Sequence, residues 1–480
     1  MKKILSCVLA AFMIPGLIAC SANNDTNVAS DGDSTNTLLV GYGVADITPR
    51  DSVPLQGYGN TERRMSTGFW SEMYQVALAV TDADGNTAIL IAADACWLEN
   101  TLAEKIRFQI EQECGVPADQ VVIAALHQHS APDMYNNNAP SGITYRDTIF
   151  YPGAVKAAKA AMENRAPATV QVATVETENM NFVRRYLNSD GRYVGSESGD
   201  ITPVSHETEV DNDLQLIRFN RKGQITMDGK EAKDIILANF QGHPHLGTNS
   251  KDTNAHSDMV GVFRDTIMKE MDCHAIYFSG AGGNVDMRSR IEEENKTSDY
   301  KAHGRRLARY VVNATDAFTD VNLTAVKATK MTFEGICNHS RDAEYAQAKE
   351  AYNVWLNTGD ETLLKKYNYA NWIEAYSVYK NYNRPESESF EIFALSFGDV
   401  AFVAAPYEMF DTNGMEIKEN SPFKMTVIAS IANGGMEYIP SAIAYEHGCY
   451  EVFATHFEAG TGELLRDSYL EMLKDLHSQY

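Results

Sequence analysis

The residues with the clearest chemical potential are two histidines one residue apart, His127 and His129, near the end of the segment 121–133, VVIAALHQHSAPD. The six apolar residues before them, three of which are β-branched, predict a short buried strand. Side chains alternate along an extended chain, so an H-x-H pair leaving a strand should direct both imidazoles to the same side. Such a pair suits a first-row metal ion, because neutral histidine is a common ligand for one. The competing interpretation is a pair of purely structural histidines.

Polar side chains follow several other predicted strands in the same way. His243 and His245 follow the strand 234–239, a glycine-rich loop at 279–286 follows 275–278, and Glu408 and Tyr438 follow the last two strands. Open α/β sheets place their ligand sites in the crevice beyond the carboxyl ends of the strands. The sequence therefore predicts an α/β fold in which these distant residues converge.

Two histidines and a carboxylate, with one position open to water, are typical of a hydrolytic zinc centre. The metal lowers the pKa of its bound water from 15.7 to roughly 7, which makes hydroxide available at neutral pH. A second histidine near that water could act as general base, and arginine or tyrosine donors would suit a developing oxyanion. The residue types thus favour metal-dependent hydrolysis.

The elements that must position these residues alternate between strands and helices. Helices are predicted at 101–114, 153–164, 259–271, 300–318 and 462–476. The segment 342–380 differs, since it is polar, helical and rich in tyrosine and tryptophan. We interpret it as an inserted helical segment that could line a groove, although aromatics at helical spacing usually serve packing.

The first residues predict export rather than structure. Residues 1–20 combine two lysines with an apolar run too short to span a membrane, and they end in Leu-Ile-Ala-Cys, which resembles a bacterial lipobox. Residues 21–37 form a polar, flexible tether. We therefore expect a lipoprotein signal peptide and a protein anchored in the bacterial envelope through lipidated Cys20, on the outer membrane, facing the periplasm or the surface.

Charge and cysteine usage exclude two other classes. The formal net charge is −24 without any long basic stretch, which argues against nucleic acid as a partner. No C-x-x-C spacing occurs, so a cysteine-based zinc site is not expected.

Several segments together resemble a known family, the neutral/alkaline (non-lysosomal) ceramidases. They are GYGVADITP, ALHQHSAPD, GHPHLG, SGAGGNVD and APYE, and they occur in the family's order from about Gly41 to the closing helix. The resemblance is to a short form without the C-terminal immunoglobulin-like domain. It implies one catalytic domain over 38–480, with a mixed sheet flanked by helices and the inserted segment 342–380.

The resemblance also implies a single zinc ion held by two histidines, a glutamate and a tyrosine. In this sequence these ligands are His127, His243, Glu408 and Tyr438.

Three further residues gain a role through the resemblance. His129 would be the general base, and Tyr450 with Arg184 would stabilise the oxyanion. Two alternatives stay open, because His245 leaves the same strand as His243 and Arg185 is adjacent to Arg184. In the family the arginine follows an asparagine, whereas here it follows a valine.

The predicted function is zinc-dependent hydrolysis of the N-acyl amide of ceramide or of a related N-acylated amphiphile. The substrate would be a lipid or another small molecule, and the products a fatty acid and an amine. One alternative is a zinc hydrolase of another amide or ester on the same scaffold. The other is a non-catalytic surface lipoprotein that binds lipid or glycan through 342–380.

Overall fold

The computed structural model of the protein describes residues 38–58, 64–199, 201–291, 293–294 and 299–480. All of them lie within one compact unit, Thr35–Tyr480. The predicted signal peptide, Cys20 and the tether lie outside the described residues. Within the described ranges, no helix combines the length and apolar character that crossing a bilayer requires.

A mixed sheet dominates the N-terminal half. Its order is β14-β12-β11-β6-β1-β3-β4-β5, with the short β16 also paired to β6. The strands are β1 (Leu38–Asp46), β3 (Tyr74–Thr81), β4 (Thr87–Ala93), β5 (Val121–Ala125), β6 (Ala166–Glu176), β11 (Asp213–Asn220), β12 (Ile235–Phe240), β14 (His274–Ser279) and β16 (Thr319–Asp320). The β4–β5 and β12–β14 pairs are parallel and the other pairs are antiparallel.

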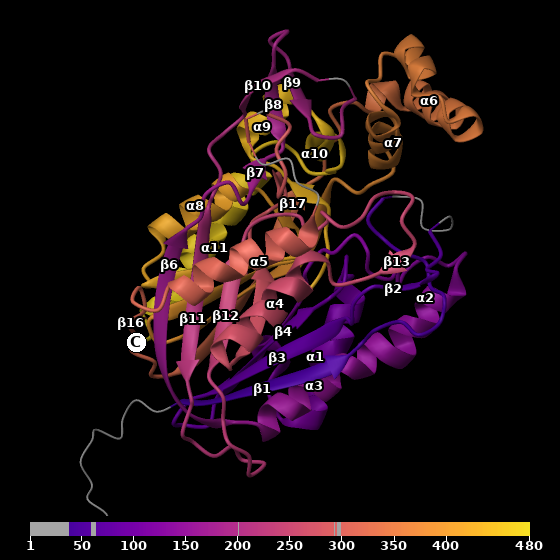
Figure 1. Ribbon diagram of the computed structural model, residues 1–480. Helices are drawn as coiled ribbons and strands as arrows, with labels where there is room; N and C mark the ends of the chain where they lie inside the picture. The colour runs from indigo at the N-terminus through magenta and orange to yellow at the C-terminus, as the bar shows by residue number, and fades with distance from the viewer. Residues whose placement is uncertain (1–37, 59–63, 200, 292, 295–298) are drawn as a thin grey trace, which may run out of the picture. The chain divides into compact units, whose positions relative to one another are not determined.

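Helices cover both faces of this sheet (Figure 1). Alternate residues of β3 point to opposite faces, so Leu78 packs in one core cluster and Ala79 in another. The first cluster includes apolar residues of α4 (Asp258–Met271) and α5 (Tyr300–Asn313), and the second includes residues of α1 (Asn100–Cys114) and α3 (Tyr151–Glu163). Burial on both faces explains why β5 is apolar throughout and β4 is apolar after Thr87.

A second sheet forms the C-terminal half. It has the order β17-β18-β19-β21, in which β19 and β21 are parallel. Its strands are β17 (Val326–Ile336), β18 (Ser387–Phe397), β19 (Val400–Ala405) and β21 (Met425–Ser430), and α8 (Asp411–Asn420) and α11 (Thr461–His477) pack on it. The buried Asn239 side chain joins the two sheets, since its amide donates to Phe278 O (3.0 Å) and to Ile428 O (2.8 Å).

The aromatic-rich segment folds as helices between β17 and β18. These are α6 (Tyr345–Thr358), the 3₁₀ helix Glu361–Tyr367 and α7 (Trp372–Asn381), and Figure 1 shows α6 and α7 standing apart from the large sheets. They have their own small core, and the Trp355 and Trp372 rings stack with centroids 4.2 Å apart.

The predicted α/β class with a mixed sheet flanked by helices is confirmed. One helix is shorter than predicted: the segment 300–318 is helical only to Asn313. Thr319 and Asp320 instead pair with β6, so the chain must leave the helix before it reaches them. Strands β11 and β17 were not anticipated.

Candidate active site

The four candidate metal ligands all follow strands of the two sheets. His127 follows β5, His243 follows β12, Glu408 follows β19 and Tyr438 follows β21. Glu408 pairs with Tyr438 in the parallel strands β20 (Glu408–Met409) and β22 (Tyr438–Ile439), and His243 forms an isolated bridge to Asp286 in the segment after β14. The parallel strand pairs therefore deliver residues from both sheets to one place.

His127, His243 and Glu408 form a compact donor set. One potential ligand atom from each lies within 4.8 Å of the others, and all three residues are buried. Glu408 Oε2 lies 3.0 Å from His243 Nε2 and 3.4 Å from His127 Nε2. Burial raises the pKa of the Glu408 carboxyl, whereas His127 and Arg184 lower it.

The outer nitrogens of both histidines are already engaged. His127 Nδ1 donates to Cys96 O at 2.7 Å and His243 Nδ1 donates to Val285 O at 3.0 Å. These bonds fix the tautomer and leave both Nε2 lone pairs facing Glu408, an arrangement typical of metal-binding histidines. The donor set therefore fits a divalent cation.

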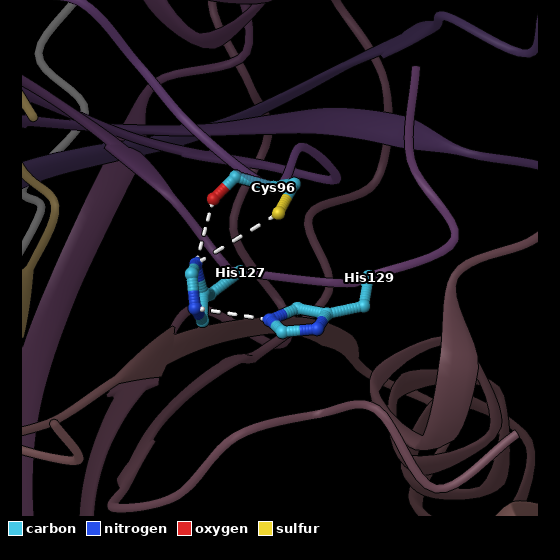
Figure 2. Close-up of side chains that lie close together, drawn as sticks. All are labelled: Cys96, His127 and His129. Atoms are coloured by element: carbon cyan, nitrogen blue, oxygen red, sulfur yellow. Dashed lines mark hydrogen bonds between the residues drawn. The ribbon is translucent and has the colours of Figure 1, made fainter. Parts of the chain in front are cut away.

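A second group of potential ligands, Cys96 with His127 and His129, fits a cation less well. Figure 2 shows His127 between the other two residues, which approach opposite nitrogens of its ring. Cys96 Sγ lies 4.0 Å from His127 Nδ1, which the Cys96 carbonyl already occupies, whereas His129 Nε2 lies 3.1 Å from His127 Nε2. Burial also raises the pKa of the Cys96 thiol well above its usual value, which disfavours the thiolate that a metal needs.

The backbone at His127 differs from the predicted geometry. Its φ is 69°, so the chain has left the extended conformation before the H-x-H pair. Strand alternation was thus the wrong reason for expecting the two imidazoles to meet. They meet because a left-handed residue turns the chain, a strained conformation that is found preferentially at functional sites.

Tyr438 adds an oxygen next to the donor set. Its hydroxyl lies 3.5 Å from His243 Nε2 and accepts a hydrogen bond of 3.1 Å from Arg184 Nη2. The Arg184 guanidinium lies 5.7 Å from the centroid of the Tyr438 ring and 5.9 Å from that of Tyr450. Burial raises the pKa of Tyr438 well above its usual value, as does the Glu408 charge.

His129 and Tyr450 line the same cavity next to the donor set. Burial lowers the pKa of His129 well below its usual value, and the neighbouring histidines and Arg184 lower it further, so the imidazole is neutral. Its Nδ1 is buried without a hydrogen-bond partner among the described residues. Tyr450 begins the short helix α10 (Tyr450–Phe453), and its ring packs edge-on against Tyr438 at 5.5 Å.

In the structure, His243 and His245 have different neighbours, and so do Arg184 and Arg185. His243 lies in the donor set, whereas His245 stacks on His129 at 5.0 Å and has its Nε2 3.5 Å from Asp286 Oδ1. Arg184 reaches Tyr438, whereas Arg185 bonds to Glu207 and Glu451. All seven candidate residues are thus brought together, and their chemical roles stay predictions.

Two buried carboxylates, Asp94 and Glu451, support the candidate residues. Asp94 accepts from Gln128 Nε2 at 2.8 Å and from Arg264 Nη2 at 2.6 Å, which holds the residue between the two histidines. Glu451 was missed, although its carboxylate accepts from Arg184 Nε at 2.8 Å and from Arg185 Nη1 at 3.1 Å. Its position directly after Tyr450 was the only available signal.

Two cavities open onto the site. One, of about 810 Å³, is lined by His129, Arg184 and His245 among others. The other, of about 450 Å³, is lined by Glu408 and by aromatic residues that include Trp372 of the inserted segment. Both cavities share Tyr438 and Tyr450, so they meet at the candidate catalytic groups.

Comparisons with known proteins support the fold. Residues 38–243 match the family model described as neutral/alkaline non-lysosomal ceramidase, N-terminal. Neutral ceramidase from Pseudomonas aeruginosa has the same fold, with a TM-score of 0.67 at 16% identity over 93% of this chain and 75% of that one. A ceramidase structure described as complexed with C2 gives a TM-score of 0.66 at 15% identity over 92% and 76% of the two chains. Among curated protein sequences, none matches significantly.

Proposed function

Because this chain carries the N-terminal region and the fold of the neutral/alkaline non-lysosomal ceramidases, a family of hydrolases, we propose that it is a zinc-dependent amidohydrolase. Its substrate is ceramide or a related N-acylated amphiphile, which it cleaves to a fatty acid and an amine. The observation that carries the proposal is the convergence of His127, His243 and Glu408, with both Nδ1 atoms bonded to carbonyls and both Nε2 atoms facing the carboxylate.

In this proposal His127, His243, Glu408 and Tyr438 hold the ion. Zinc bound there supplies Lewis acidity and lowers the pKa of a water molecule. His129, a neutral imidazole at the site, accepts a proton as the water oxygen attacks the amide carbonyl carbon. The same imidazole returns the proton to the nitrogen as the C–N bond breaks, so that carboxylic acid and amine leave.

Arg184 and Tyr450 stabilise the oxyanion that forms at the carbonyl. Arg184 is buried and paired with Glu451, so its position is fixed before substrate binds. Preorganised donors of this kind are usually the largest single contribution to catalysis. We further propose that lipidated Cys20 anchors the protein in the bacterial envelope, close to lipid substrates.

The test uses the purified full chain in detergent micelles with a fluorescent ceramide. Release of fatty acid should stop on chelation and return on addition of zinc, and elemental analysis should find about one zinc per chain, as a single four-ligand site requires. His127→Ala and Glu408→Ala should abolish both metal and activity. Stoichiometric zinc without ceramide cleavage would retain the metal site and reject ceramide, and absence of both would reject the proposal.

A further inference from the structure

The two cavities differ in chemistry and together form one two-lobed cleft. We call the cavity of about 450 Å³ the aromatic lobe; its lining includes Trp97, Trp372, Ile373, Tyr376 and Phe453. We call the cavity of about 810 Å³ the polar lobe; its lining includes Ser196, Glu197, Asn249, Ser250, Arg288 and Arg290.

The aromatic lobe suits an unbranched apolar chain. Trp372, Ile373 and Tyr376 come from α7, and Trp97 faces them from the loop before α1. The aromatic lobe has three charged lining residues: Lys380 and Glu437 form an ion pair at 2.6 Å, and Glu408 faces His243 in the donor set at 3.0 Å. An acyl chain can bury its methylenes against these rings without meeting an unpaired charge.

The polar lobe has more charged lining residues than the aromatic lobe, and most of them already take part in hydrogen bonds or ion pairs. The carboxylates of Asp252, Asp286 and Asp299 accept main-chain N–H groups. Arg290 donates to the carbonyls of Ser196 and Gly199.

Arg184 is paired with Glu451. Burial raises the pKa of the Glu197 carboxyl to about 7, and the charges of Arg184 and Arg185 oppose this rise. Arg288 is exposed in the lobe and has no hydrogen-bond or ion-pair partner in the described part of the chain. It lines this lobe together with His129 and His245. An unoccupied guanidinium near the reacting groups suits a carboxylate ligand.

The general base indicates which part of a substrate enters which lobe. His129 lines the polar lobe and does not line the aromatic lobe. Because the leaving nitrogen must take its proton from this residue, the amine half of the substrate lies on the polar side. A sphingoid amine would have to place its apolar chain among charged groups there, which is unfavourable.

We propose that the substrate is an N-acyl amine with an anionic amine half, such as an N-acyl amino acid, whose carboxylate binds Arg288 while the acyl chain fills the aromatic lobe. This inference rests on the proposed hydrolase function and narrows its substrate class. Hydrolysis adds one water across the amide C–N bond and releases a fatty acid and an amino acid.

The test compares N-lauroylglycine with N-lauroylethanolamine, which have the same acyl chain and differ in the carboxylate. Arg288→Ala should lower kcat/KM for N-lauroylglycine by roughly ten- to a hundredfold, as expected for a lost charge-assisted bond, and should leave the ethanolamide nearly unchanged. Arg288→Lys should restore part of the difference. Arg192→Ala is the matched control, since Arg192 is an exposed arginine paired with Asp190 and does not line the lobe.

A binding measurement separates the two proposals. Calorimetric titration of the His129→Ala protein with each compound should show tighter binding of N-lauroylglycine, and this preference should disappear in His129→Ala/Arg288→Ala. Carboxylate preference without turnover of any amide by the unaltered protein would reject the hydrolase and retain the anion site. Cleavage of ceramide with no preference for the carboxylate, or equal effects of Arg288→Ala on both compounds, would overturn the inference and retain the hydrolase.

Discussion

The buried Glu451 carboxylate should decide whether Arg184 can act on the substrate. It is fully buried and bridges Arg184 Nε and Arg185 Nη1 at 2.8 and 3.1 Å. Glu451→Gln keeps one oxygen acceptor but turns an amide group toward guanidinium donors, and Arg184 loses its only ion-pair partner in the described residues. Removing one partner of a buried ion pair costs about 3–5 kcal/mol, and the retained oxygen should limit this to about 2–3 kcal/mol of unfolding free energy.

Glu451→Gln should also impair catalysis, by a free energy similar to its effect on stability. Loss of one oxyanion donor lowers kcat by about 10²–10³, so a misplaced Arg184 should lower it by roughly ten- to a hundredfold while bound metal is retained. Glu207→Gln is the matched control, because Glu207 is a buried carboxylate that bonds Arg185 and does not contact Arg184. Denaturant unfolding and steady-state kinetics on both variants provide the assay. Equal losses of kcat in the two variants would refute a specific role for the Arg184–Glu451 pair.

Three further expectations follow from the site and its supports. His129→Ala should retain zinc and lose turnover, whereas His127→Ala and Glu408→Ala should lose zinc; full activity of His129→Ala would remove the general-base role. Gly283→Ala should lower metal occupancy and cost about 1–3 kcal/mol, because the added Cβ would lie 2.7 Å from the main-chain oxygen of Glu408; unchanged metal content would contradict this. Burial raises the pKa of Asp258 to about 6 from 3.8, so its ionisation opposes folding as pH rises. Asp258→Asn should therefore gain up to about 3 kcal/mol relative to the unaltered protein between pH 4 and pH 7, measured by denaturant unfolding, and a pH-independent difference would be inconsistent with that carboxyl's burial.

The sequence predicted the convergence of the site because parallel strands deliver their carboxyl ends to one edge. The His127 segment and the His243 segment each follow a strand with a parallel neighbour, and both were placed correctly next to Glu408. The left-handed backbone at His127 could not be predicted, since positive φ is uncommon for every residue with a Cβ, even though histidine adopts it more often than most. The acceptors that orient the two imidazoles are main-chain oxygens of Cys96 and Val285. Every residue has a main-chain oxygen, so the residue types could not identify these acceptors.

The inserted helices illustrate a second limit. Their aromatic residues predicted packing or a groove wall, and the structure shows both uses. Trp372 stacks on Trp355 within the insertion and, with Tyr376, also lines the cleft. Helical periodicity identifies such residues, but it cannot tell which side of a helix meets the rest of the protein.

The candidate ligands divide equally between the two sheets. His127 and His243 follow strands of the N-terminal sheet, whereas Glu408 and Tyr438 follow strands of the C-terminal sheet and pair with each other through β20 and β22. An ion bound by all four would therefore act as a cross-link between the halves of the fold as well as a reagent. The binding energy of the ion would stabilise the interface between the two sheets. In the apo protein, this interface should therefore be the first part of the fold to separate on unfolding.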